Sequence, residues 1–354
     1  MRADLTGRLE RLLGVRPAQV RIVGGQHGVD HYRVVLADGR LVFVKAVARG
    51  PDDEAVARGQ DVKAVARGPD SPADDGDAAA VLHAEASGLR WLAEAGAVPV
   101  PEVLGCDERM LAISWVPQEQ PSRLAAERFG RDLARLHAAG ASRLGAPWRG
   151  FIAGLPLGNA DGNNSNADGS NSNADGSPDS DTSSGAWPQW YARERLLPFA
   201  RRARDSGQLG PADVRLVEAV DDRLPELAGP AEPPSRIHGD CWSGNVLWSG
   251  GRGALIDPAA HGGHRETDLA MLALFGAPSL ERILAAYQEA AQEATQEATQ
   301  EAAQEAAQNA APLADGWRNR VPLHQLHPLL VHVCLFGAGY REAMLGAARA
   351  ALSG

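Results

Sequence analysis

The chain has 354 residues, of which 44% are hydrophobic, and its formal net charge is -10. This length allows two domains or lobes, each with its own core, and the hydrophobic content is typical of a globular protein. A nucleic-acid binder needs clustered Lys and Arg to contact phosphates, so the acidic charge argues against that class of protein.

The cysteines and the N-terminus indicate the compartment. Cys106, Cys241 and Cys334 are widely spaced and odd in number, which predicts neither a disulfide framework nor a zinc site. The first residues lack the apolar segment of a signal peptide, and no apolar run approaches the length of a membrane span. These features predict a cytoplasmic protein that binds neither a membrane nor nucleic acid.

The first part of the chain, residues 1–113, is predicted to be rich in strands. The leucines of Leu5–Leu13 share one face and predict a short amphipathic helix. Strands are predicted at Val20–Val23, Tyr32–Leu36 and Leu41–Val47. The turn between the first two strands consists of Gly24, Gly25, Gln26, His27 and Gly28. Such a glycine-rich turn can bring backbone N–H groups close to phosphates, although an ordinary hairpin is the alternative.

A lysine on the third strand has a candidate partner on the next helix. A kinase needs a strand Lys to grip the phosphates of ATP and a helix Glu to hold that Lys in place. Lys45 and Glu85, the latter in the predicted helix Ala78–Ala95, fit these roles. Solvated side chains on a strand edge and on a helix surface are the alternatives. Lys63 has the same local sequence as Lys45, but only Lys45 follows a strand pattern.

Three repeat tracts interrupt the chain at about residues 48–77, 159–185 and 288–311. The first repeats a nine-residue unit, and the second repeats Asn-Ala-Asp-Gly units that are too polar to bury a core, which predicts disorder. The third repeats Gln-Glu-Ala-Ala or Gln-Glu-Ala-Thr. It predicts a solvated extension of the helix that begins at Leu280.

Residues 114–354 are predicted to form a mainly helical second part. The strand Leu111–Val116 leads into it, and the backbone of Ser114, Trp115 and Val116 is a candidate adenine-binding segment. Ser122 caps a helix that extends to about Ala139. Further helices are predicted at Trp187–Ala203, Ala212–Leu227, Asp268–Leu274, Leu280–Tyr287 and His327–Phe336.

The strongest motif is His238-Gly239-Asp240-Cys241-Trp242-Ser243-Gly244-Asn245, followed by a strand that leads to Asp257. The interval between Asp240 and Asn245 equals that between the base Asp and the metal-binding Asn of the kinase catalytic loop. Asp257 fits the second metal-binding Asp. A polar turn that binds no metal is the alternative, since Asp and Asn are common in turns. The three residues together favour phosphoryl transfer from ATP with Mg²⁺.

Long stretches around these residues resemble the fructosamine kinase (ketosamine-3-kinase) family. They include HGDCWSGNVLW, LIDPAAHGGHRETDLAML and LHQLHPLLVHVCLFGAGY, and the resemblance covers nearly the whole chain outside the repeats. The family is similar in fold to aminoglycoside phosphotransferases and protein kinases. The resemblance therefore implies an α+β, two-lobed, protein-kinase-like fold with a sheet-rich N-lobe and a mainly helical C-lobe.

The resemblance also implies roles for individual residues. Asp240 would accept the proton of the 3-hydroxyl of a ketosamine, while Asn245 and Asp257 would hold Mg²⁺. Lys45 and Glu85 would position ATP under the glycine-rich turn. Trp242 and His264 would contact the substrate, and Asp268 would brace the catalytic loop. The substrates would be small ketosamines or glycated protein amines, and the enzyme would be a monomer or a homodimer.

Two other functions remain open at this level. One is a small-molecule kinase of the aminoglycoside or choline type, which shares the His-Gly-Asp motif. The other is an inactive pseudokinase, because Gln26 and His27 follow Gly25 where the family often has Gly-Gly-Ser or a cysteine. The intact set of Lys45, Glu85 and the three acidic or amide residues of the catalytic loop argues against a pseudokinase.

Overall fold

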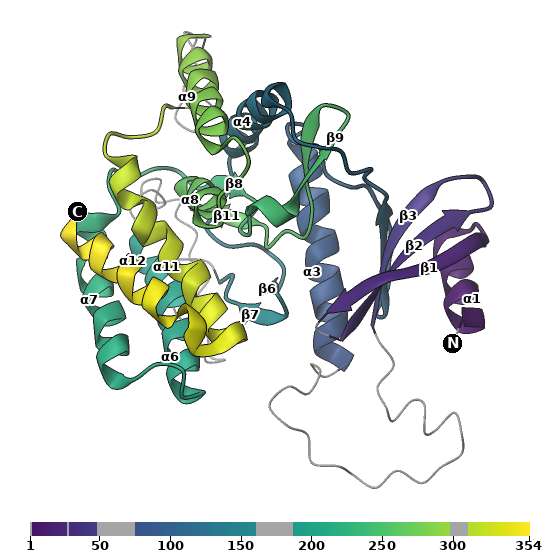
Figure 1. The fold of residues 1–354 in the computed structure, drawn as a ribbon, viewed down its shortest axis with the longest axis horizontal. Coiled ribbons are helices and arrows are strands. Elements are labelled where there is room, and N and C mark those ends of the chain that lie inside the picture. Colours follow the sequence, from purple (N-terminus) through teal and green to yellow (C-terminus); the bar gives the residue numbers. More distant parts are fainter. Residues whose placement is uncertain (1, 27, 48–74, 161–186, 298–310) are drawn as a thin grey trace, which may run out of the picture. The chain divides into compact units, whose positions relative to one another are not determined.

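The computed structural model describes residues 2–26, 28–47, 75–160, 187–297 and 311–354 (Figure 1). It divides into two compact units, which are described separately. Unit 1 contains Met1–Arg90, Pro101–Val116 and Ala153–Leu155, and unit 2 contains Trp91–Val100, Pro117–Ile152 and Pro156–Gly354. Lys63 and most of the first two repeat tracts lie outside the described residues.

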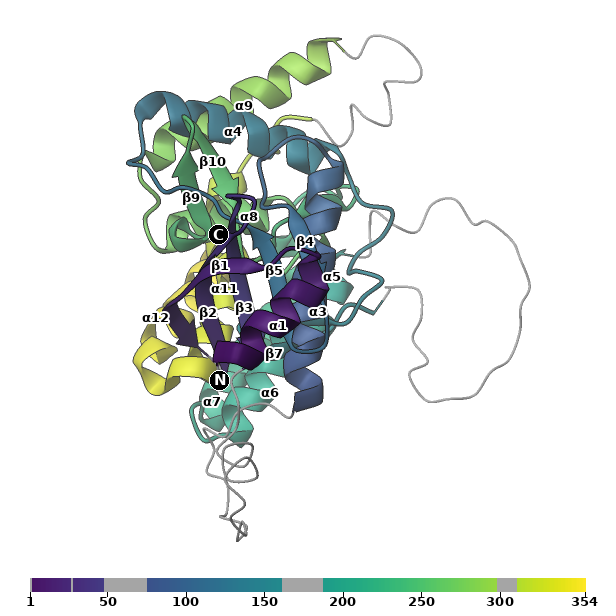
Figure 2. The ribbon, with the colours of Figure 1, turned by 90° about the vertical axis from the view of Figure 1, so that its right-hand side faces the viewer.

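Unit 1 is built on a five-stranded antiparallel sheet in the order β1-β2-β3-β5-β4. Its strands are β1 (Pro17–Gln26), β2 (Val29–Leu36), β3 (Leu41–Val47), β4 (Val103–Cys106) and β5 (Met110–Ser114). Helix α1 (Arg2–Leu13) packs on the sheet through Leu9, which is fully buried with Val34, Val42 and Val44 (Figure 2). The predicted leucine face of this helix is therefore confirmed. Helix α3 (Asp75–Glu94) follows β3 in sequence.

The glycine-rich turn is shorter than the sequence predicts. Gly24, Gly25 and Gln26 belong to strand β1 and pair with His31, Asp30 and Val29 of β2. A Cβ atom at Gly25 would lie 2.9 Å from the carbonyl oxygen of Val29, so a side chain is excluded there. The prediction of a five-residue turn was wrong because strand pairing continues as far as glycine allows the two backbones to approach. His27 lies outside the described residues.

Unit 2 is mainly helical. Its helices are α4 (Arg123–Ala138), α5 (Trp187–Tyr191), the π-helix η1 (Ala192–Leu196), α6 (Leu197–Asp205), α7 (Pro211–Leu227), α8 (Glu266–Leu274), α9 (Leu280–Glu297), α11 (Trp317–Phe336), the 3₁₀-helix η4 (Gly337–Tyr340) and α12 (Arg341–Ser353). Helices α4 and α9 lie side by side (Figures 1 and 2), and Phe129 and Ile283 are fully buried in their shared core. The hydroxyl of Ser122 accepts a hydrogen bond from the N–H of Ala125, which confirms the predicted cap.

The remaining strands are short, and β8 and β9 directly precede and follow the loop that contains Asp240 and Asn245. They are β6 (Gly150–Ile152), β7 (Leu155–Leu157), β8 (Ser235–Ile237), β9 (Val246–Ser249), β10 (Arg252–Leu255) and β11 (His261–Gly263). Strand β8 pairs with β11, and β9 pairs with β10 through a turn at Gly250-Gly251, both of which have positive φ. A 3₁₀ turn, η2 (Ser243–Asn245), lies between β8 and β9.

The boundary between the units differs in detail from the predicted one at residue 113. Residues Trp91–Val100 belong to unit 2 because Leu92, Ala97 and Val98 are buried in its core. Residues Pro101–Val116 belong to unit 1, so this unit extends three residues beyond the predicted boundary. The predicted absence of a disulfide is confirmed, since Cys106, Cys241 and Cys334 are all free.

One segment is long and apolar enough to cross a membrane by length and composition alone, namely Trp317–Ser353 with a mean hydropathy of 1.2. This finding corrects the prediction that no apolar run approaches the length of a membrane span, because in the described residues a single helical segment passes that test. Half of that apolar window is buried inside the protein, and Leu323, Leu326 and Leu330 of α11 are almost completely enclosed. Core burial therefore accounts for the apolar character of α11.

Asn159 corrects the predicted start of the second repeat tract. The sequence places this residue in a polar segment without structure, but it is 9% exposed. Its side-chain N–H donates to the carbonyl of Trp148 at 3.2 Å, and its Oδ1 accepts from Arg195 at 3.2 Å. The first residue of the tract is therefore part of the core of unit 2, which composition alone does not reveal.

The three repeat copies offer a matched test of this difference. We expect Asn159→Ala to lower the free energy of unfolding by about 1–3 kcal/mol, because it removes the hydrogen bonds that Asn159 makes with Nη2 of the buried Arg195 and with the Trp148 carbonyl. Asn166→Ala and Asn173→Ala, which change the first residue of the other two copies, should alter it by less than about 0.5 kcal/mol. Urea unfolding followed by circular dichroism measures all three; equal effects would show that Asn159 has no structural role.

Candidate active site

The predicted catalytic residues meet on one loop of unit 2. The side-chain N–H₂ of Asn245 donates to the backbone carbonyl and to Oδ2 of Asp240, both at 2.9 Å. This arrangement leaves the amide oxygen of Asn245 for a cation. The five-residue interval therefore folds the loop back on itself, so that the two side chains lie next to each other.

Asp257 is positioned through the residue before it. The N–H of Ile256 donates to the carbonyl of Asn245 at 3.0 Å, and the Nε2 of His238 bonds the carbonyl of Ile256 at 2.9 Å. Burial lowers the pKa of His238 below its usual value, which favours a neutral ring. In that ring Nε2 carries the proton that it donates to Ile256, and Nδ1 accepts a hydrogen bond from the N–H of Asp240 at 3.3 Å. Two loop residues thus hold Ile256, and Asp257 follows in the left-handed conformation with φ of 53°.

Asp268 forms hydrogen bonds with the backbone of the catalytic loop, as the predicted supporting role requires. Its carboxylate is fully buried and accepts hydrogen bonds from the backbone N–H groups of His238 at 2.7 Å and Gly239 at 2.9 Å. His137 contributes a third contact at 3.2 Å, and its other ring nitrogen lies 2.9 Å from the hydroxyl of Tyr287. His137 thus links α4 to the loop and to α9, a contact that the sequence does not reveal.

The environment of Asp240 favours proton transfer near neutral pH. The side chain is partly exposed, but desolvation raises its pKa from 3.8 to about 7. The neighbouring charges of Asp257 and Asp268 act in the same direction, whereas the hydrogen bond from Asn245 opposes them. A carboxyl with a pKa near the working pH is well suited to a general base.

The donor atoms around Asp240 fit a magnesium ion. Asp240, Asp257 and the amide oxygen of Asn245 are hard oxygen ligands of the kind that Mg²⁺ prefers. The mutual repulsion of the carboxylates, which contributes to the raised pKa of Asp240, is what a divalent cation would relieve. Asn245 and Asp257 are therefore candidate ligands.

Unit 1 carries a buried ion pair at the predicted positions. The Nζ of Lys45 lies 2.6 Å from Oε2 of Glu85, and both side chains are about one-tenth exposed or less. Lys45 is on β3, which pairs on both sides with β2 and β5, so it is not a solvated residue on a sheet edge. The predicted contact between strand and helix is confirmed, and it holds the ammonium group in one place.

Two backbone N–H groups of the predicted adenine-binding segment form hydrogen bonds within unit 1. The N–H of Ser114 donates to the carbonyl of Glu102 at 2.8 Å, and that of Trp115 donates to the carbonyl of Leu41 at 3.1 Å. These two amides are therefore not available to an adenine ring, whereas the carbonyl groups of Ser114 and Trp115 and the backbone of Val116 stay candidates. The phosphate role of Gly24, Gly25 and Gln26 likewise stays a prediction.

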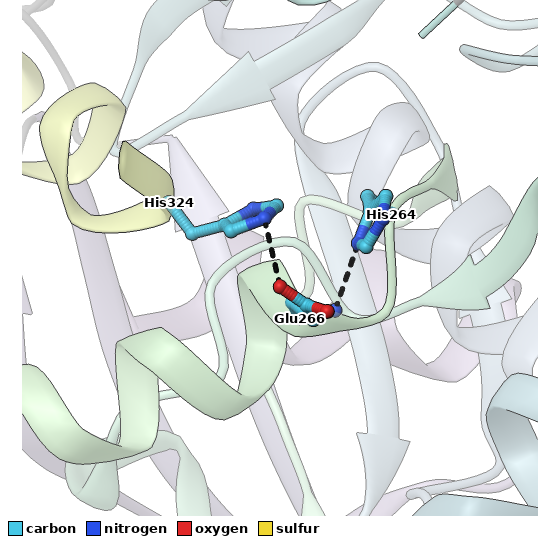
Figure 3. A group of neighbouring side chains, drawn as sticks. All are labelled: His264, Glu266 and His324. Carbon is cyan, nitrogen blue, oxygen red and sulfur yellow. Dashed lines mark hydrogen bonds and ion pairs between the residues drawn. The ribbon is translucent and has the colours of Figure 1, made fainter. Parts of the chain in front are cut away.

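The two predicted substrate residues differ in environment. Trp242, two residues after Asp240, is 37% exposed. His264 is buried between the rings of Trp187 and His324, at centroid distances of 4.9 and 4.8 Å, and its Nδ1 accepts a hydrogen bond from the N–H of Glu266 (Figure 3). A direct contact with substrate stays a prediction for both residues, and the burial of His264 favours a structural role.

The cluster of His264, Glu266 and His324 resembles a metal site, since its potential ligand atoms lie within 4.8 Å of one another (Figure 3). However, Arg320 already bonds both carboxylate oxygens of Glu266, at 3.0 and 2.6 Å. The guanidinium thus neutralises the only carboxylate of this cluster. We interpret the group as a buried structural ion pair that joins α8 to α11.

Comparisons with known proteins place this chain in a family of phosphotransferases. The model of the "Phosphotransferase enzyme family" matches residues 19–303. A "Probable ketoamine kinase" of Thermus thermophilus is 31% identical over 75% of this chain and 80% of its own length. The fructosamine kinase resemblance seen in the sequence is therefore confirmed.

Solved structures extend the similarity to the fold. A crystal structure from Thermobifida fusca named "putative fructosamine-3-kinase" is 46% identical, with a TM-score of 0.78 and 99% of both chains covered. An aminoglycoside phosphotransferase with ADP bound covers 99% of both chains at a TM-score of 0.53 and 12% identity, which shows a shared fold alone. The predicted α+β, protein-kinase-like fold is confirmed.

The duplicated lysine allows a controlled test of the nucleotide site. We expect Lys45→Met to lower kcat/KM for the nucleotide by about 10²–10³-fold, the usual loss when one preorganised electrostatic donor is removed. Because the change also leaves Glu85 buried without its cation, the double variant Lys45→Met/Glu85→Gln should recover stability but not activity. Lys63→Met is the control and should leave both unchanged. Loss of activity in Lys63→Met alone would overturn the assignment of Lys45.

The Glu266 ion pair predicts a specific acid sensitivity. Burial by itself raises the pKa of Glu266, but hydrogen bonds from His324 and Arg320 outweigh it and lower the pKa from 4.5 to about 2. The stabilisation is therefore complete above pH 4.5 and is lost as the pH falls towards 2, on the order of 3 kcal/mol in all. Urea unfolding of Glu266→Gln should show a shallower loss of stability over this range. An unchanged slope would contradict the shifted pKa.

Proposed function

Because this chain belongs to the phosphotransferase enzyme family, we propose that it transfers the γ-phosphoryl group of ATP to the sugar 3-hydroxyl of ketosamines. The observation that carries the proposal is the loop on which Asp240 contacts Asn245, with Asp257 held through Ile256. The similarity to proteins named as ketoamine and fructosamine kinases supports the choice of acceptor.

The proposed reaction is a direct displacement at phosphorus. Asp240 accepts the proton of the 3-hydroxyl while the sugar oxygen forms a bond to the γ-phosphorus, and the bond to the β-phosphate oxygen breaks to release ADP. Desolvation raises the pKa of Asp240 above its usual value, which makes its carboxylate a stronger base for this proton. Asp268 keeps the backbone of His238 and Gly239, and with it Asp240, in a fixed position.

The remaining residues act on the charge of the nucleotide. A magnesium ion bound by Asn245 and Asp257 would supply positive charge for the phosphates. Lys45, oriented by Glu85, would contact phosphate oxygens of ATP. These roles require a fixed ammonium group and oxygen ligands, and the contacts described above provide both.

The product explains why such a reaction is useful. A phosphate on C3 of a ketosamine is unstable, and its loss leads to release of the free amine. The proposed activity is therefore a repair of glycated small molecules or glycated protein amines in the cytoplasm.

A substrate screen tests the proposal directly. ADP formation should be measured with ketosamines, aminoglycosides and amino alcohols at equal concentrations. We expect turnover with ketosamines and phosphate at the sugar C3, located by ³¹P NMR. Turnover restricted to aminoglycosides or amino alcohols would overturn the proposed acceptor, and nucleotide binding without any turnover would indicate a pseudokinase.

The role of Asp240 has its own test. Asp240→Asn should lower kcat on a ketosamine by about 10²–10⁴-fold, since the variant lacks the proton acceptor. Its amide oxygen can still accept the hydrogen bond from Asn245, so the loop and the affinity for ATP should be retained, as measured by calorimetry. Asp205→Asn, at an exposed carboxylate on α6, is the control. Turnover near the wild-type value in Asp240→Asn would disprove the assignment.

A further inference from the structure

Three helices of unit 2 contribute one side chain each to a buried chain of hydrogen bonds. The hydroxyl of Tyr287 on α9 lies 2.9 Å from Nδ1 of His137 on α4. Nε2 of the same ring lies 3.2 Å from Oδ2 of Asp268 on α8. The two rings are almost completely enclosed, and their centroids are 5.5 Å apart. The Tyr287–His137–Asp268 chain therefore connects α9 to the carboxylate that holds the catalytic loop.

Asp268 sets the direction of these hydrogen bonds. Each of its oxygens accepts a backbone N–H group, from His238 or from Gly239, as an ionised carboxylate does. A carboxylate has no proton to donate, so Nε2 of His137 carries the proton in its bond to Asp268. In a neutral ring Nδ1 is then the acceptor, and the hydroxyl of Tyr287 is the donor beside it. Burial raises the pKa of Tyr287, which keeps this hydroxyl protonated.

Arg265 fixes the orientation of the Tyr287 hydroxyl. Its guanidinium, which can only donate, forms a side-chain hydrogen bond with this hydroxyl. Glu232 holds the guanidinium in place through two hydrogen bonds of 2.8 and 2.6 Å. Because the hydroxyl oxygen accepts from Arg265, its hydrogen is directed to Nδ1 of His137.

The other tautomer of His137 cannot support Asp268. It would place the lone pair of Nε2 against a carboxylate oxygen, and two acceptors repel each other. Asp268 would lose a donor while its charge stays buried, which weakens its hold on the backbone of the catalytic loop. The hydroxyl of Tyr287 prevents this change, because it donates to Nδ1 and so favours the ring with its proton on Nε2.

We propose that Tyr287 is a positioning residue for the proposed reaction and acts through His137. It fixes the tautomer that donates to Asp268, and Asp268 holds the backbone of Gly239, the residue before the base Asp240. This inference rests on the proposed function, in which Asp240 accepts the proton of the sugar. The alternative is that Tyr287 only fills the core of unit 2, a role in which its hydroxyl would not affect the reaction.

Tyr287→Phe separates the two roles, because it keeps the ring and removes the hydroxyl alone. We expect kcat on a ketosamine to fall about tenfold to a hundredfold with KM for ATP retained, since a small misplacement of a reacting group has effects of this size. Tyr191→Phe is the matched control, because this tyrosine is also buried and its hydroxyl bonds the carbonyl of Leu323 at 2.9 Å. It should leave kcat unchanged. A loss in Tyr287→Phe no larger than that in Tyr191→Phe would overturn the inference.

A double-variant cycle with His137→Gln tests the path of the effect. The side-chain N–H₂ group of Gln can donate to Asp268 but has no tautomers, so this variant no longer depends on the hydroxyl of Tyr287. We therefore expect Tyr287→Phe to have little further effect on kcat when it is added to His137→Gln. Losses that multiply would show that Tyr287 acts independently of His137, which contradicts the proposal.

The ¹⁵N NMR signals of the His137 ring provide a test that needs no substrate, and their absence in His137→Gln identifies them. In the wild-type protein we expect the proton on Nε2 alone. In Tyr287→Phe we expect a mixture that includes rings with a proton on Nδ1. An unchanged single tautomer in Tyr287→Phe would refute the role of its hydroxyl. If the wild-type protein phosphorylates no ketosamine, the proposed function fails, whereas the NMR signals still decide whether Tyr287 sets the tautomer.

Discussion

The buried carboxylate of Asp268 is the constraint on which the catalytic loop depends. A fully buried charge is costly unless hydrogen bonds replace its lost hydration, and Asp268 obtains them from His238, Gly239 and His137. Although burial raises the pKa of Asp268, these bonds lower it below its usual value. The loop cannot move away from α8 without leaving this charge unsatisfied. Tyr287 extends the same network into α9.

This constraint also fixes the backbone of Gly239, the residue before Asp240. Gly239 has a φ of 79°, a conformation that favours glycine. A Cβ atom there would also lie 2.3 Å from the carbonyl oxygen of Ala259, so only glycine fits at this position. Asp240 is therefore positioned before any substrate binds. A base that is fixed in advance requires little reorganisation during the reaction, which is where enzymes gain much of their rate.

Unit 1 also contains buried charges that a partner compensates, namely Lys45 and Glu85. Lys45 and Glu85 are both buried, and each lowers the cost of the other's burial. The repeat tract between them lies mostly outside the described residues, yet the pair forms across it. Longer surface connections cost little free energy, about 0.6 kcal/mol for each doubling of length, whereas a broken buried pair costs several kcal/mol. Insertions are therefore tolerated where they leave such pairs intact.

The sequence by itself determined the catalytic loop, several strands and most helices, because these depend on spacing and periodicity within short segments. It also identified Lys45 and Glu85, because a kinase needs such a pair to hold the phosphates of ATP. Tertiary structure alone decided the burial of Asn159, the contact of His137 with Asp268 and the pairing of Arg320 with Glu266. Each of these joins segments far apart in the chain. Periodicity shows which face of an element is apolar, but only packing decides which faces meet.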